Sequence, residues 1–229
     1  MTIELKTNFF TKAIFEDDKV TIGKNEIPYE NISAFEIKSK PRLRGKGEIF
    51  LIEDGKVKYF AFRAKEFDKI KEINSILRDK INSNNDLSKW KLDTPEDLYN
   101  YAKYRGFVQG ATKKWFVAHF DALLKIVSEN EKRLYPFVAI FDYISATNNK
   151  GSACFLVTDE KIYAIYQHLL RFNVYSIKLK DIDKILITPS PARSIITIAT
   201  EDSAYNIALE TESAKPLFRE LKKITDNGL

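Results

Sequence analysis

The last third of this 229-residue chain repeats a pattern that is already present in its first third. Residues 27–32 (IPYENI) match residues 177–182 (IKLKDI), and the apolar positions that follow coincide without a gap. Two further pairs of segments match in the same order, 15–20 with 157–162 and 50–54 with 198–202. A repeat constrains the fold because each copy must form the same kind of unit. We therefore expect two copies of one small β-rich domain.

Short runs rich in Ile, Val, Phe and Tyr, separated by turn residues, predict antiparallel strands in both copies. In the first copy these runs are 3–10, 13–16, 19–22, 32–38, 47–53 and 56–63. In the second copy they are 136–144, 152–158, 161–166, 174–179, 182–188, 194–200 and 205–209. The Asp54-Gly55 dipeptide predicts a tight hairpin because both residues tolerate a positive φ.

Helical periodicity follows the strands of each copy. The apolar residues that mark it are at 67, 70, 73, 77 and 81 in the first copy, and at 214, 217, 218, 221 and 224 in the second. Between the copies we expect two more helices. The first has Thr94 as its N-cap, Pro95 at its first position and Gly106 at its end. The second covers 111–129 with an apolar stripe.

These elements predict an α+β protein with two domains, each an antiparallel β-barrel or sandwich closed by a C-terminal helix. The predicted boundaries are 1–82 for the first domain and 135–229 for the second. The polar stretch 83–93 is expected to be a linker, in which Trp90 docks against a neighbour, and 94–134 forms the helical pair.

Seven short antiparallel strands closed by one amphipathic helix resemble the pleckstrin-homology (PH) fold. Residues 153–163 (ACFLVTDEKIY) are similar to a hairpin of the bacterial PH-like domains found in low-GC bacteria and their phages: an apolar strand, Thr-Asp, a basic residue and apolar-Tyr. Residues 177–182 and 27–32 resemble the Asp-Ile strand motif of that family. The resemblance implies tandem PH-like domains and leaves function open, because the motifs are turns and strand edges. Eukaryotic phosphoinositide binders carry a basic cluster in the first hairpin loop, whereas the matching turns here hold only Lys12 and Lys150, so inositol-phosphate recognition is not implied.

Composition narrows the classes of function further. The net charge of +5 comes from interspersed opposite charges, as on an ordinary solvated surface, and it does not by itself indicate nucleic acid. The single Cys154 excludes an internal disulfide and fits a reducing compartment. No signal segment or membrane-spanning run is apparent. We expect a cytoplasmic protein, with the inner face of the membrane as a peripheral site.

Catalytic or cofactor-binding motifs are not evident in the sequence. His119 and His168 lack partners at metal-ligand spacing, and we expect His119 to be a core or interface histidine. Gly45-Lys46-Gly47 is too short to cradle a nucleotide, and Cys154 is expected to be buried and inert. The sequence therefore predicts no enzyme, no cofactor and no metal.

One segment carries a one-sided charge array. Within residues 38–46, five basic side chains occupy alternate positions without an acidic residue: Lys38, Lys40, Arg42, Arg44 and Lys46. If the segment is extended, these side chains project to one side and form a weak site for anionic lipid, at about 1 kcal/mol per residue, or for a nucleic-acid backbone. The alternative is a solvated hairpin loop.

The other uneven feature is a hairpin in the second copy that is longer by 8 residues than its counterpart in the first copy. Its end carries Leu169, Leu170, Arg171 and Phe172, which either form a protein contact or pack against the helical pair. Together these features predict a non-catalytic binding or scaffold protein that binds a protein partner or self-associates, or that makes peripheral membrane contacts. No small-molecule substrate is implied. The alternative is a nucleic-acid-associated or phage-encoded protein that uses residues 38–46 on a host complex.

Overall fold

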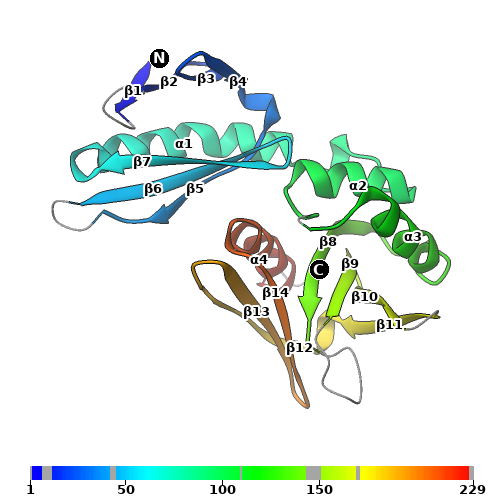
Figure 1. Ribbon diagram of the computed structural model, residues 1–229. Coiled ribbons are helices and arrows are strands. Elements are labelled where there is room, and N and C mark those ends of the chain that lie inside the picture. The colour runs from blue at the N-terminus through cyan, green and yellow to red at the C-terminus, as the bar shows by residue number, and fades with distance from the viewer. Residues whose placement is uncertain are drawn as a thin grey trace. The chain divides into compact units, whose positions relative to one another are not determined.

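The computed structural model describes residues 2–6, 12–41, 45–108, 110–142, 151–168 and 171–226, without the side chains of residues 168 and 226. The chain divides into two compact units. One consists of Met1–Lys89 with Tyr104–Gly106, and the other of Trp90–Lys103 with Phe107–Leu229. Each unit contains antiparallel strands and a helix that follows its last strand (Figure 1).

The first unit contains two antiparallel sheets. Strands β1 (Ile3–Lys6), β2 (Lys12–Phe15), β3 (Lys19–Ile22) and β4 (Asn25–Pro28) pair in sequence order. After a 3-10 turn (Tyr29–Asn31), β5 (Ile32–Ser39), β6 (Lys46–Glu53) and β7 (Lys56–Arg63) form the second sheet. A second 3-10 turn (Ala64–Glu66) leads into α1 (Phe67–Asn84), which packs against β5 and β1 (Figure 1).

The apolar periodicity explains how the first unit is held together. The predicted helical stripe is confirmed, because Ile70, Ile73 and Leu77 of α1 are buried in the same core as inward-facing residues of both sheets. The predicted Asp54-Gly55 turn is also confirmed. Both residues have a positive φ, 45° at Asp54 and 78° at Gly55, so the turn follows the twist of β6 and β7.

The second unit forms one seven-stranded antiparallel sheet in the order β11-β10-β9-β8-β14-β13-β12. Its strands are β8 (Arg133–Phe141), β9 (Gly151–Thr158), β10 (Lys161–His168), β11 (Arg171–Lys178), β12 (Ile182–Thr188), β13 (Arg193–Thr200) and β14 (Ala204–Glu210). A 3-10 turn (Leu179–Asp181) joins β11 to β12. The closing helix α4 (Thr211–Asp226) packs against β12, β13 and β14.

The repeated motif forms the same local structure in both units. In each, a strand ends, one 3-10 turn follows, and the next strand begins with a β-bulge, between Ile32 and Ala34 or between Ile182 and Lys184. The first residue of the turn donates its N–H to a hairpin carbonyl in both units. Tyr29 N donates to Asp18 O and Leu179 N donates to Glu160 O, each at 2.8 Å. The repeat therefore preserves a backbone geometry with little sequence identity.

Two helices belong to the second unit and precede its strands. Helix α2 (Pro95–Tyr104) starts at Thr94, whose Oγ1 accepts the N–H of Asp97 at 3.2 Å, which confirms the predicted N-cap. The predicted docking of Trp90 is confirmed by its edge contact with Tyr101, at 5.2 Å between ring centroids. Helix α3 (Lys113–Leu124) packs against β9, β10 and β11, with Thr112 as its N-cap.

Several predicted elements differ from those of the structure. The predicted linker begins too early, because α1 continues to Asn84 and a further 3-10 turn covers Leu87–Lys89. The helix expected over 111–129 is shorter and ends at Leu124. Strand β4 was not predicted, because only Ile27 of its four residues is buried and so no alternation marks it. The α+β class and the closing helix of each unit are as predicted.

Candidate functional site

The basic array is only partly within the described residues, because Arg42 and Arg44 lie outside them. Lys38 lies on β5, where its Nζ is 3.5 Å from Glu48 Oε2 and 4.3 Å from the ring centroid of Tyr59. Lys40 and Lys46 are exposed. The first member of the array is therefore held by partners within its own sheet.

The backbone at the base of this array is tightly packed. Register between β5 and β6 shifts between Ile37 and Ser39, which interrupts the strict alternation of side chains at Lys38. Across from this bulge, a Cβ on Gly47 would lie 2.3 Å from Phe62 Cζ and 2.8 Å from the backbone oxygen of Ser39. Gly47 is thus explained by close packing in the sheet.

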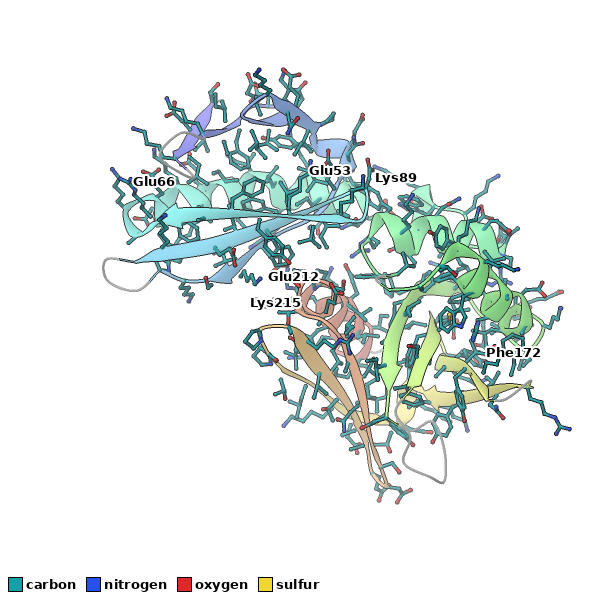
Figure 2. The ribbon with its side chains drawn as sticks, in the orientation of Figure 1. Glu53, Glu66, Lys89, Phe172, Glu212 and Lys215 are labelled. Atoms are coloured by element: carbon teal, nitrogen blue, oxygen red, sulfur yellow. The ribbon has the colours of Figure 1, made fainter. Side chains whose placement is uncertain are left out.

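The long hairpin of the second unit brings its end to helix α3. Strands β10 and β11 have eight residues each, against four each for the equivalent β3 and β4, and they stay paired up to His168 and Arg171. Leu169 and Leu170 lie outside the described residues. Arg171 is exposed, and Phe172 faces α3 while 43% of it remains exposed (Figure 2).

Phe172 is supported by an aromatic group of α3. Its ring meets the imidazole of His119 edge-on, with centroids 4.9 Å apart and an interplanar angle of 77°. The imidazole in turn lies 4.0 Å from the ring of Trp115. Phe172 therefore packs against helix α3 and also presents an exposed apolar face. The first matches the predicted packing against the helical pair, and the second leaves a surface for the protein contact.

His119 is the buried centre of this aromatic group. It is 1% exposed, which confirms the expected core position, and its Nδ1 lies 2.8 Å from the carbonyl oxygen of Trp115. Burial lowers the pKa of His119, against the effect of that hydrogen bond. In the neutral form Nδ1–H donates to the carbonyl, so Nε2 carries a lone pair. Nε2 has no hydrogen-bond partner among the described residues.

The residues that resemble the family hairpin make up a structural cluster. The carboxylate of Glu131, which precedes β8 and is 5% exposed, accepts hydrogen bonds from Thr158 Oγ1 and Tyr163 OH, both at 2.7 Å. Lys161 Nζ lies 3.2 Å from the same carboxylate. Asp159 continues the contact, because its Oδ1 accepts the N–H of Lys132 at 2.9 Å. This hairpin motif therefore fixes the segment that leads into β8.

The remaining predicted residues fall in different surroundings. Cys154 is fully buried on β9, as expected, and burial raises the pKa of its thiol. The side chain of His168 lies outside the described residues. Among the described residues no group of three or more His, Cys, Asp or Glu is placed to hold a metal ion. None of the described helices is both long and apolar enough to cross a bilayer.

Comparisons with known proteins were made by sequence and by structure. No protein-family model matches the chain, and no curated protein matches it. Among solved structures it is similar to the hSac2 domain of the human phosphoinositide phosphatase Sac2, with a TM-score of 0.37, 12% identity, and coverage of 52% of this chain and 86% of that one. It is also similar to the DH/PH domains of PDZ-RhoGEF in complex with RhoA, with a TM-score of 0.38, 12% identity, and coverage of 72% and 48%.

A third similar structure contains the PH and C1 domains of the Vav1 exchange factor, with a TM-score of 0.33, 11% identity, and coverage of 72% and 40%. The match spans about half the length of the PDZ-RhoGEF chain. All three TM-scores are below 0.5.

Proposed function

We propose that this chain is a non-catalytic binding protein whose second unit engages a protein partner through the exposed face of Phe172. The observation that carries the proposal is a large aromatic side chain that is 43% exposed and yet held in place from behind by His119. Aromatic residues in such positions are the ones that dominate protein interfaces, because they bury a large area with little loss of conformational entropy.

The surroundings of Phe172 fit the anatomy of a contact site. The cation of Arg171 is adjacent and exposed, and arginine is enriched at the rims and hot spots of interfaces. The hairpin that carries both residues is longer than its counterpart in the first unit, so the fold itself does not require this extension. A partner that offers an apolar pocket beside an acidic group would match this surface.

The first-unit array supports the alternative functions less well. Lys38 already has Glu48 and Tyr59 as partners, so a phosphate group would have to compete with both for its charge. We therefore rank the protein partner first, and anionic lipid or nucleic acid after it. The single buried cysteine fits a reducing compartment, where we place the protein.

The test is a selection of random linear peptides displayed on phage against the full chain. We expect enriched peptides that bind the wild type and lose at least about tenfold in affinity with Phe172→Ala, the usual effect of truncating a hot-spot aromatic. The matched control is Leu186→Ala, because Leu186 of β12 is 44% exposed in the same unit, and this variant should bind normally.

Two outcomes would contradict the proposal. One is the absence of enriched peptides, and the other is a set of peptides that bind Phe172→Ala as tightly as the wild type. If either outcome is found and the wild type co-sediments with anionic liposomes in a salt-sensitive manner, the membrane alternative would replace the protein partner.

A further inference from the structure

The second unit has a cavity of about 530 Å³ where two neighbouring strands separate. Strand β8 pairs with β14 only at Phe141 with Ile207 and at Ile140 with Ala208. Nearer the start of β8, the N–H of Val138 donates instead to the carbonyl of Phe107, at 2.8 Å. The cavity lies beside this divergence, and its volume is within the range of about 300–1,000 Å³ that small-molecule sites occupy.

One part of the cavity is apolar and includes an aromatic wall. Trp115 of α3 lines it together with Val138 and Ile140 of β8 and Ala208 of β14. Trp115 is partly exposed, and the His119 ring lies beside it with centroids 4.0 Å apart. Aromatic rings pack on an indole in offset or edge-on geometry, which favours an aromatic ligand body.

An exposed cation also lines the cavity. The guanidinium of Arg193, at the start of β13, has no hydrogen-bond or ion-pair partner among the described residues. Its register partner on β14, Glu210, lines the cavity too. A free guanidinium binds a carboxylate through two parallel hydrogen bonds, so this end of the cavity is suited to an anionic group.

The third feature is the imidazole of His119, which lines the same cavity. Its Nδ1 is occupied by the carbonyl of Trp115, whereas Nε2 is buried and has no partner among the described residues. Buried polar atoms are rarely left unpaired, so the lone pair of Nε2 is a position where a ligand donor would be satisfied.

We propose that the cavity binds a small aromatic carboxylate that carries an N–H donor. The carboxylate binds Arg193, the aromatic ring packs on Trp115, and the N–H donates to Nε2 of His119. Phe172 is not among the residues that line the cavity, so this site is distinct from the proposed protein contact, although His119 borders both. The proposed site binds this ligand without a chemical reaction.

The test is calorimetric titration of the full chain with indole-3-propionate. This probe carries the carboxylate, the aromatic ring and the N–H donor. We expect a Kd of about 1 mM or tighter, in keeping with the size of the probe. Two analogues each remove one group: indole-3-propionamide lacks the charge and 3-phenylpropionate lacks the N–H. Both should bind at least about fivefold more weakly, because each leaves one protein group unpaired.

Protein variants and a spectrum locate the site. Arg193→Gln should weaken binding of indole-3-propionate by about tenfold, so that the acid and the amide bind with equal affinity. Lys184→Gln on β12 is the matched control, and it should leave both affinities unchanged. The chain has two tryptophans, so the amide-region NMR spectrum offers an internal control. The indole N–H signal of Trp115 should shift on titration and that of Trp90 should not.

Any of four results would overturn the proposal. They are equal affinity for the acid and the amide, equal affinity for the indole and phenyl acids, unchanged binding by Arg193→Gln, and a shift of the Trp90 signal in place of the Trp115 signal. Failure to detect binding of indole-3-propionate at millimolar concentration would overturn it as well.

Discussion

Glu131 shows how one buried charge can hold a loop to a hairpin. Burial raises the pKa of this carboxyl, but the hydrogen bonds from Thr158, Tyr163 and Lys161 outweigh burial and lower it below the ordinary value of 4.5. Removing one partner from a buried, hydrogen-bonded carboxylate leaves the other groups unsatisfied. The residues that resemble a family motif are therefore needed for stability.

We expect Glu131→Gln to lower the free energy of unfolding at pH 7 by about 1–3 kcal/mol, because a neutral amide cannot accept all three donors. Since the pKa of Glu131 is lower in the folded state, its stabilising effect is complete above pH 4.5 and is lost as the pH falls through the folded-state pKa. The difference between wild type and variant should thus shrink at acid pH. Urea unfolding at several pH values measures this.

The control for this prediction is Glu129→Gln, because Glu129 is exposed and lies two residues away. That variant should have the stability of the wild type throughout the pH range. An equal dependence of stability on pH in wild type and Glu131→Gln would show that the carboxylate of Glu131 does not contribute as described.

The strand–3-10–strand junction is the element that the two units share, but it is buried to different extents. Tyr29 is 3% exposed, and its hydroxyl donates to Glu16 O at 2.7 Å. Its carbonyl also accepts a hydrogen bond from Asn84 Nδ2 at the end of α1, at 2.7 Å. The equivalent Leu179 is only partly buried. The same backbone turn therefore contributes more to the packing of the first unit.

We expect Tyr29→Ala to destabilise the protein by about 3–4 kcal/mol and Leu179→Ala by no more than about 1–2 kcal/mol, because the first change empties a packed site and the second removes a half-exposed side chain. Guanidinium unfolding followed by circular dichroism compares them. Equal effects of the two substitutions would contradict the difference in packing.

At the level of elements, the sequence predicted what periodicity and capping encode. Helix α1, the Thr-Pro start of α2 and the Asp54-Gly55 turn were found where expected, whereas α3 is shorter than its apolar stripe predicted. Strand β4 was missed because one buried residue gives no period. The candidate site was harder, because Glu131 contacts Thr158 across 27 residues, and Arg193 and Trp115 line one cavity although they are far apart in the sequence. Such contacts leave no local pattern in the sequence.

At the level of the whole molecule, the two copies have the same plan and different surfaces. The second has longer strands β10 and β11, and helix α3 packs on them, so Phe172, Trp115 and His119 form one aromatic group. The first has no equivalent extension, because β3 and β4 have four residues each. The proposed protein contact at Phe172 therefore depends on the added length of β10 and β11.

The measurement that tests this most directly is an NMR titration of the full, isotope-labelled chain with a peptide selected on it. We expect chemical-shift changes at Phe172 and at its neighbours on α3, β10 and β11, with the signals of residues 12–89 unchanged. Changes confined to residues 12–89, with Phe172 unaffected, would contradict the assignment of the binding surface to the second unit.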